Sequence, residues 1–303
     1  MTSVRIDRRR WLAGTAALCT LPVAAQAADV LTRPIPSSGE RLPAVGLGSW
    51  ITFNVGTDPA ARAACADVMR AFFDAGGRVI DSSPMYGSSQ SVIGEGLARL
   101  GMAGRVFAAD KVWTGDGSGG PAQIEATRRL WQLPRLDLVQ VHNLLAWEPH
   151  LQTLAAMKAE GRIRHVGLST SEGRRHDTLE RLLRTQPVDV VQLTYNPLDR
   201  EAEARLLPLA QERGIAVLVN RPFRQGALID TLNRHPVPAF AAELGCDGWA
   251  QLVLKWILAH PAVTCVIPAT TQVAHVRQNL GAAVGPLPDA AMRRRIASTI
   301  AAL

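Results

Sequence analysis

The sequence predicts an α/β protein: a single (β/α)8 TIM barrel with an N-terminal β-hairpin and an extra C-terminal helix. Eight apolar runs alternate with stretches that have the periodicity of amphipathic helices. The runs are apolar throughout, as in parallel strands that are covered on both faces. No break in composition and no long linker divides the chain, which favours one closed barrel over two domains. The expected strands are residues 44–47, 78–80, 106–109, 136–141, 165–167, 189–193, 216–219 and 263–267.

Turn and capping signals predict the remaining elements. Alternating polar residues from 32 to 41, around Ser37-Ser38-Gly39, predict the hairpin, and residues 288–303 predict the extra helix. One helix is expected to begin near Ser88, where serine side chains can cap free backbone N–H groups. Other helical patterns cover residues 60–75, 123–133, 148–160 and 201–213. Helix C-caps are expected at Gly76, Gly161 and Gly214.

Residues 1–27 have the features of an export signal. Asp7-Arg8-Arg9-Arg10-Trp11-Leu12 is a twin-arginine pattern, residues 13–25 form a weakly hydrophobic core, and Ala25-Gln26-Ala27 is an A-x-A cleavage site. Their order favours a signal over a disordered basic tail or an uncleaved anchor. The sequence therefore predicts a signal peptide at 1–27 and a barrel domain at 28–303. It also predicts a periplasmic or exported protein with the twin-arginine export machinery as a partner.

Composition argues against several other classes. Removing residues 1–27 takes away four arginines and one aspartate, so the formal charge falls from +7 to +4. The remaining charge is spread along the chain, which argues against a nucleic-acid partner. No stretch after the signal is long and apolar enough to span a membrane. No metal is expected, because Cys65, Cys246 and Cys265 have neither disulfide nor metal-ligand spacing.

Four polar residues stand at or just after the ends of consecutive predicted strands: Asp81, Tyr86, Lys111 and His142. The carboxyl ends of barrel strands converge on one mouth, so these side chains are expected to share a catalytic site. Each has a structural alternative: a capping aspartate, a tyrosine packed in its loop, a snorkelling lysine or a core histidine. The agreement of four such positions in one chain favours the functional interpretation.

These residue types together suggest proton transfer to a carbonyl oxygen. A phenol with a pKa of about 10 is a weak acid until a nearby cation stabilises its phenolate, and Lys111 is the expected cation. Asp81 can hold that lysine charged, and His142 can donate a hydrogen bond to the same substrate oxygen. None of these side chains can supply a hydride, so a nicotinamide cofactor is implied.

A series of motifs runs along the chain in a specific order and spacing. They are Gly46-Leu47-Gly48-Ser49-Trp50, Ile80-Asp81 with Tyr86-Gly87, Asp110-Lys111-Val112-Trp113, Val141-His142-Asn143, Gly167-Leu168-Ser169, Val191-Gln192 with Tyr195-Asn196-Pro197, and Val266-Ile267-Pro268. The series resembles the aldo-keto reductase superfamily, from the hairpin to the last barrel helix. The resemblance implies a (β/α)8 barrel that binds NAD(P)(H) without a Rossmann domain. Consistent with this, no G-x-G-x-x-G lies in a strand–turn–helix context.

The resemblance also implies residue roles. Tyr86 would be the proton donor, Lys111 and Asp81 its tuning pair, and His142 the residue that orients the substrate. The implied cofactor residues are Ser169 and Gln192 at the nicotinamide carboxamide, and Thr270, Gln278 and Asn279 at the adenosine end.

Several cofactor positions depart from the family pattern. Thr170 stands where members usually have Asn, and Asn220 stands where many stack an aromatic ring on the nicotinamide. We therefore expect a clamp rebuilt from Thr170 and the segment Asn220-Arg221-Pro222-Phe223. NADP-preferring members commonly have Lys and Arg at the 2′-phosphate, where this chain has Ala269 and His275. Family habit favours NADP(H) over NAD(H), with Thr270, Thr271 and Arg277 as alternative donors to the phosphate.

The substrate is expected to be a small-molecule carbonyl compound. Trp50 and Trp113 could line an apolar pocket mouth, and Asn143 follows His142 at the same strand end; rim packing is the structural alternative for the tryptophans. Two other functions stay open from the sequence. One is a non-catalytic nicotinamide-binding sensor or regulatory barrel. The other is a hydrolase or isomerase that uses only Asp81 and His142 as an acid–base pair.

Overall fold

The barrel predicted from the sequence is present. A computed structural model of the chain describes Thr2 and residues 30–303, so the predicted signal at 1–27 lies, apart from Thr2, outside the described residues. Eight parallel strands form one sheet in sequential order. They are β3 (Leu47–Gly48), β4 (Val79–Asp81), β5 (Phe107–Val112), β6 (Leu136–His142), β7 (Ile163–Ser169), β8 (Val190–Thr194), β9 (Ala216–Asn220) and β10 (Val263–Val266).

The first and last strands of this sheet meet and close it. Parallel bridges pair Val45 with Val266 and Gly48 with Ala269. The Gly46 N–H donates to the Val266 carbonyl at 2.8 Å, and the Gly48 N–H donates to the Pro268 carbonyl at 3.0 Å. Closure removes the unpaired edges that an open sheet would leave. It also brings the carboxyl ends of all eight strands to one mouth.

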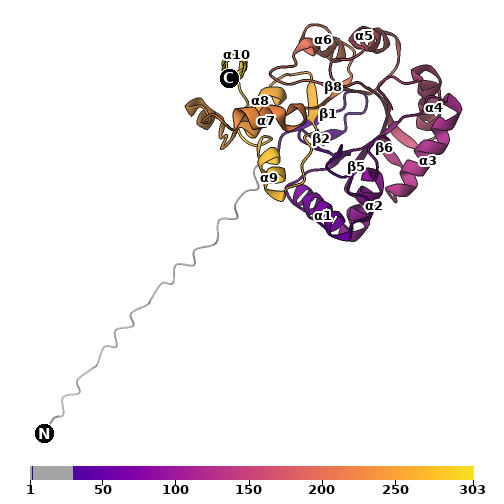
Figure 1. Cartoon of the computed structure of the whole chain (residues 1–303), viewed down its shortest axis with the longest axis horizontal. Coiled ribbons are helices and arrows are strands. Elements are labelled where there is room, and N and C mark those ends of the chain that lie inside the picture. The colour runs from indigo at the N-terminus through magenta and orange to yellow at the C-terminus, as the bar shows by residue number, and fades with distance from the viewer. Residues whose placement is uncertain (1, 3–29) are drawn as a thin grey trace.

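Helices surround the strands, as Figure 1 shows for α1 to α6. The main helices that follow the eight strands, in chain order, are α1 (Pro59–Asp74), α2 (Ser89–Leu100), α3 (Gly120–Leu130), α4 (Trp147–Ala159), α5 (His176–Thr185), α6 (Leu206–Glu212), α8 (Trp249–Leu258) and α9 (Val273–Gly281). The additional helices are α7 (Ala227–Leu232) and α10 (Ala290–Ala301), with short 3₁₀ helices η1 (Gly117–Gly119), η2 (Glu201–Glu203), η3 (Arg224–Gly226) and η4 (Ala239–Leu244). Asp289 caps α10 by accepting from the Met292 N–H at 2.7 Å, so the predicted extra helix is confirmed.

Two local expectations were wrong. The helix expected near Ser88 does begin there, as α2, but Ser88 makes no side-chain cap bond. Its hydroxyl instead accepts from the Gly56 N–H at 2.8 Å, which ties the loop after β3 to this loop. The helix expected over 201–213 is split into η2 and α6. Pro208 lies in the first turn of α6, where its missing N–H costs no helical bond, so the helix restarts there. The three predicted C-cap glycines all have positive φ.

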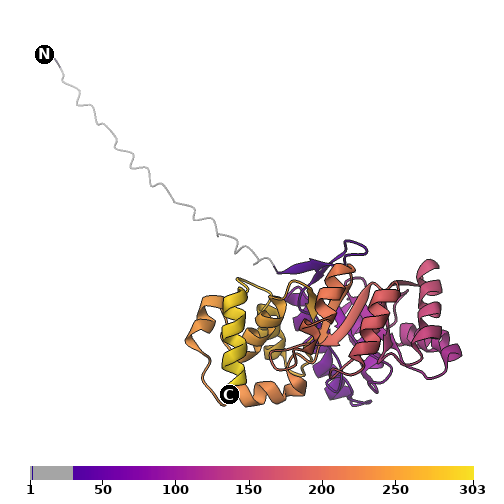
Figure 2. The ribbon, with the colours of Figure 1, turned by 90° about the horizontal axis from the view of Figure 1, so that it is seen from above.

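The N-terminal hairpin forms the floor of the barrel. It consists of β1 (Thr32–Pro34) and β2 (Arg41–Pro43), and Figure 2 shows it along one side of the molecule. The Arg33 guanidinium donates to the carbonyls of Leu258, His260 and Val263, close to the start of β10. Ile35 and Leu42 pack against the apolar interior of the barrel. The hairpin therefore lies across the amino ends of the strands, opposite the mouth.

Candidate active site

The strands place the predicted catalytic residues around one point. Asp81 is the last residue of β4, Lys111 lies near the end of β5, and His142 is the last residue of β6. Tyr86 follows in the loop between β4 and α2. Because these strands are parallel neighbours in one closed sheet, their ends converge, as predicted.

Lys111 and Asp81 form a buried ion pair. The Lys111 Nζ lies 2.5 Å from Asp81 Oδ2 and also donates to the Ser82 carbonyl at 2.7 Å. The other carboxylate oxygen accepts from the side-chain amides of Gln192 at 2.8 Å and Gln140 at 3.2 Å. Burial lowers the pKa of Lys111, but Asp81, together with smaller contributions from Tyr86 and Asp110, outweighs that effect, so that the net pKa lies above its ordinary value. The lysine therefore stays charged.

Tyr86 lies against this lysine and against His142. The Lys111 Nζ is 5.2 Å from the centroid of the tyrosine ring, and the Tyr86 and His142 rings meet edge to face with centroids 6.0 Å apart. Burial raises the pKa of the Tyr86 phenol, and Lys111 opposes that rise. The lysine thus acts in the expected direction, but in this structure desolvation outweighs it, and the phenol keeps its proton at neutral pH.

His142 is a neutral ring. Burial, together with the charge on Lys111, lowers its pKa to about 3. Its Nδ1 lies 2.9 Å from the Ser169 hydroxyl at the end of β7. A neutral imidazole has one N–H donor and one acceptor nitrogen. When Nδ1 accepts from Ser169, Nε2 carries the proton and can donate.

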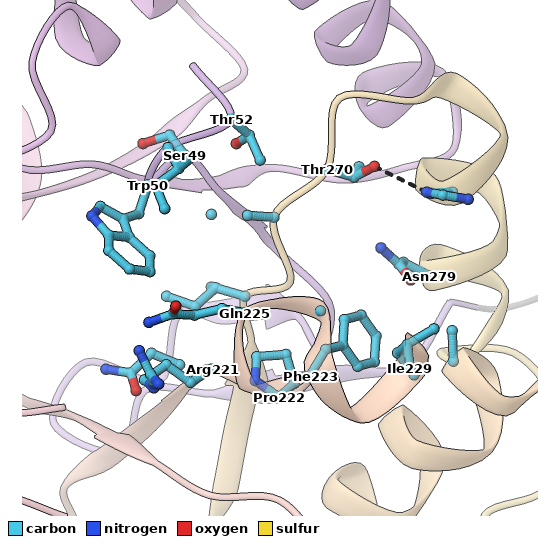
Figure 3. Close-up of a pocket in the computed structure, with 18 of the residues that line it drawn as sticks. Ser49, Trp50, Thr52, Arg221, Pro222, Phe223, Gln225, Ile229, Thr270 and Asn279 are labelled. Atoms are coloured by element: carbon cyan, nitrogen blue, oxygen red, sulfur yellow. Dashed lines mark hydrogen bonds between the residues drawn. The ribbon is translucent and has the colours of Figure 1, made fainter. Parts of the chain in front are cut away.

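A cavity of about 750 Å³ opens at this mouth. Its size is typical of a small-molecule or cofactor site. Figure 3 shows Trp50 and Gln225 on one side of it and Thr270 and Asn279 on another. Most of the predicted site residues line it: Trp50, Asp81, Tyr86, His142, Asn143, Gln192, Asn220, Arg221, Phe223, Thr270, Gln278 and Asn279.

Four predicted site residues do not line the cavity: Lys111, Ser169, Thr170 and Trp113. The first three are buried directly behind the lining. Trp113 instead lies beyond the end of β5 and is 40% exposed. Its backbone N–H and C=O are both bound by the Gln123 side chain, on α3, at 2.6 and 2.9 Å. The structure thus brings Trp50 to the pocket, but it does not bring Trp113 there.

Comparison with known proteins identifies the family. Residues 44–298 match the sequence pattern described as "Aldo/keto reductase family". The chain is 31% identical over 245 residues to "Methylglyoxal reductase YeaE" of Escherichia coli, an alignment that covers 78% of this chain and 84% of the relative. The chain belongs to the aldo/keto reductase family. It is therefore an NAD(P)H-dependent oxidoreductase that reduces a carbonyl group.

Other similar proteins carry different nicotinamide cofactors in their names. "NADH-specific methylglyoxal reductase" of E. coli is 26% identical, over 85% of this chain and 94% of its own length. A Klebsiella pneumoniae aldo/keto reductase solved with NADP and acetate is 26% identical with a TM-score of 0.74, over 86% of this chain and 93% of its own. A second structure from that organism, in complex with NADPH, is 25% identical with a TM-score of 0.75, over 90% and 95%. The preference between the two nicotinamides is thus open on the relatives alone.

Where the nicotinamide is expected, at the ends of β7, β8 and β9, the polar side chains mostly bind one another, and the Thr170 hydroxyl is left without a partner. Asn220 links three strand ends: its amide donates to the Thr170 carbonyl at 2.9 Å and to Gln192 Oε1 at 3.2 Å, and its oxygen accepts from Thr194 at 2.7 Å. The Thr170 hydroxyl is buried and has no hydrogen-bond partner. A buried hydroxyl without a partner, just behind the cavity wall, is a group that a bound molecule could satisfy.

Sequence reasoning missed the ion pairs beside the mouth. Arg221 lies 3.0 Å from Glu172, and Arg174 pairs with the same carboxylate. The pair of Arg221 with Glu172 joins the loop after β9 to the loop after β7 across one side of the cavity. Arg221, Arg224 and Gln225 all have positive φ, so the loop after β9 is held in an unusual backbone conformation. Arg221 and Glu172 follow different strands, and no motif links them in the sequence.

Proposed function

We propose that Tyr86 gives its proton to the substrate oxygen while Lys111, paired with Asp81, stabilises the charge that develops on the phenolate. The observation that carries this assignment is the buried Lys111–Asp81 pair, 2.5 Å apart, beside the tyrosine ring. When bound, a reduced nicotinamide supplies the hydride. A fixed cation next to a phenol lowers the barrier to proton loss without any rearrangement at the moment of reaction.

His142 orients the carbonyl group in this proposal. Its neutral ring can donate a hydrogen bond from Nε2 to the substrate oxygen, because Ser169 occupies Nδ1. The single hydroxyl proton of Ser169 is then used, and its lone pairs are left to accept from a carboxamide N–H₂. The free Thr170 hydroxyl is the second group at that end. Gln192 has a smaller part in binding the carboxamide than expected, because its amide already donates to Asp81.

Substitution of each of the two tyrosines tests the catalytic assignment. Tyr86→Phe removes the proton donor and is expected to lower kcat by about 100-fold or more, with NADPH binding retained. Tyr195→Phe is the matched control, since Tyr195 is buried against Trp256 away from the pocket and is expected to keep turnover. The assay follows NADPH oxidation with a panel of small aldehydes. Full activity in Tyr86→Phe would contradict the assignment.

We also propose a preference for NADP(H). Thr270 and His275 meet at 3.4 Å at the start of α9, on the wall that also carries Gln278 and Asn279, and all four line the cavity. The Thr270 hydroxyl and the His275 ring lie at the N-terminus of α9, a combination that suits a phosphate, and the amides of Gln278 and Asn279 add hydrogen-bond donors from the last turn of the same helix. Phe223 lies at this end too, beside Ile229, rather than next to Trp50 (Figure 3).

The ratio of NADPH to NADH affinity, measured by fluorescence, tests this preference. His275→Ala is expected to weaken NADPH binding by about tenfold and to leave NADH binding unchanged. Arg277→Ala is the comparison variant, because Arg277 lies on the same helix but does not line the cavity. Tighter binding of NADH by the unaltered protein would overturn the preference.

Finally, we propose that the chain is exported through the twin-arginine machinery. The support is the order of twin arginines, apolar core and A-x-A site in residues 1–27. This machinery carries folded proteins, so a nicotinamide could be loaded before export. Cell fractionation tests the proposal: Arg9→Lys with Arg10→Lys should hold the protein in the cytoplasm. A cytoplasmic pool of unaltered protein that still carries residues 1–27 would contradict it.

A further inference from the structure

A second buried carboxylate lies directly behind the catalytic lysine. Asp110 precedes Lys111 on β5 and is fully buried. Successive side chains of a strand point to opposite faces, so Lys111 faces the barrel interior and Asp110 faces the surrounding helices. There Asp110 contacts Gln90 on α2 and Trp131, which directly follows α3. No salt bridge to Asp110 is present among the described residues 30–303.

The Asp110 carboxylate only accepts hydrogen bonds, because each of its partners is an N–H group. Gln90 Nε2 lies 3.1 Å from each carboxylate oxygen, and the Trp131 indole N–H donates at 2.7 Å. The backbone N–H of Lys111 donates at 2.7 Å as well. Gln90 is oriented in turn by Thr127 on α3, at 3.0 Å. A protonated carboxyl would direct its own hydrogen at one of these donors, so the arrangement fits the ionised form.

The environment of Asp110 contains few other charges. Burial raises its pKa to about 7, and the neighbouring Lys111 charge and the hydrogen bonds from Lys111 and Gln90 counteract part of that rise. Asp81, inside the barrel, is the other charged group that acts on it. The side chains that reach it from α2 and α3 are neutral. Lys111 thus lies between two carboxylates: Asp81 on its own side of the strand, and Asp110 on the other.

The backbone of β5 also needs a hydrogen-bond partner at Lys111, where its pairing with β4 has ended. The register of β4 with β5 ends at the pair Asp81 and Ala109. Beyond that pair, the Lys111 N–H donates to the Asp110 carboxylate. A buried N–H without a partner is costly, so this bond fixes the backbone that carries the lysine.

We propose that Asp110 is a positioning residue for Lys111: held by Gln90 and Trp131, its carboxylate fixes the lysine backbone from the outer face of β5 and offsets part of the lysine's charge. This role rests on the proposed function of Lys111 as the cation beside Tyr86. Because the negative charge of Asp110 offsets part of the positive charge of Lys111, removal of Asp110 leaves the phenolate of Tyr86 better stabilised. The acidity of Tyr86 is therefore the quantity that Asp110 controls.

Fluorine NMR of the full chain labelled with 3-fluorotyrosine measures that acidity without any turnover. The chain contains two tyrosines, and Tyr86→Phe assigns their signals. Asp110→Asn should lower the pKa of the residue-86 phenol by about one pH unit, as expected for the loss of one buried charge. Thr127→Val is the matched control, because it releases Gln90 but keeps the Asp110 charge, and it should leave that pKa unchanged.

The outcomes separate the two proposals. An unchanged pKa in Asp110→Asn, or the same shift in both variants, would overturn the role of Asp110 and leave it purely structural. If Asp110→Asn does not fold, Asp110→Ser removes the same charge and keeps a hydroxyl that can accept from the Lys111 N–H. In the pH profile of kcat, the loss of activity at high pH should move to lower pH by the same amount. Failure of the unaltered protein to turn over would contradict the catalytic assignment, while the NMR titration would still test Asp110.

Discussion

His142 works as a neutral hydrogen-bond donor because of where its side chain lies. It stands at the end of β6, buried beside a lysine that carries a full positive charge. An imidazolium there would be desolvated and repelled by Lys111. The chemistry of the site thus depends on the sign of its neighbours as much as on the identity of the ring.

This depressed pKa makes the stability of the protein depend on pH. The unfolded chain binds a proton at His142 near pH 6.5, whereas the folded protein binds it only at about pH 3. The contribution is therefore complete above pH 6.5 and is lost as the pH falls towards 3. Between pH 7 and pH 4, the unaltered protein should lose roughly 3 kcal/mol more stability than His142→Asn. Urea unfolding at both pH values measures the difference, and equal losses would contradict it.

At the residue scale, the sequence predicted where the catalytic residues lie better than it predicted their hydrogen-bond partners. Asp81, Tyr86, Lys111 and His142 could be found because strand ends in a parallel barrel converge wherever the strands lie. Their hydrogen-bond partners could not, because the alternation of side chains says which face a residue occupies and not what it meets there. Gln140 and Asp110 were missed for this reason, and Trp113, expected at the pocket mouth, does not line the cavity.

At the scale of elements, the boundaries of strands and helices were predictable to within a few residues. Apolar runs and glycine C-caps are local signals, and the structure follows them. The region from 221 to 248 was not predicted in detail. It holds α7 and two 3₁₀ helices, and its conformation depends on long-range pairs such as Arg221 with Glu172 and Arg224 with Asp199.

The hairpin provides a test at this scale. Arg33 donates to three carbonyl groups of the barrel, whereas Arg41 on the second hairpin strand donates only to Thr32 within the hairpin. Arg33→Met should therefore lower the free energy of unfolding by about 2 kcal/mol, since it leaves those carbonyls without a charged donor. Arg41→Met should have little effect because its bonds are exposed. Chemical denaturation of both variants measures this, and equal effects would show that the hairpin is not held through Arg33.

At the scale of the whole molecule, the closed barrel depends on close contact between β3 and the end of β10. A Cβ atom added at Gly48 would meet the Ile267 carbonyl oxygen at 2.8 Å, and one added at Gly46 would meet the Ile267 side chain at 3.0 Å as well as the Val79 oxygen of β4 at 2.9 Å. Side chains are therefore excluded where the first and last strands join. The glycines in the motif after the hairpin thus have a structural reason that is independent of cofactor binding.

Gly48→Ala should for this reason destabilise the protein by about 1–3 kcal/mol, because the closing strands would have to move apart. Gly104→Ala is the matched control, since an added Cβ there meets nothing within 4 Å. Thermal unfolding of the two variants gives the comparison. A Gly48 variant as stable as the Gly104 variant would show that the seam between β3 and β10 can relax at little cost.

The described part of the chain, from Val30 on, enters the barrel beside the hairpin, at the floor; the Leu31 N–H donates to the Ala283 carbonyl there at 2.9 Å. The cavity opens at the other end of the strands. An enzyme coupled to a bead or an electrode through its amino terminus would therefore present its mouth to the solution. Substrate and nicotinamide would reach it from the side away from the support, and a fusion partner placed ahead of residue 30 would leave the reacting groups accessible.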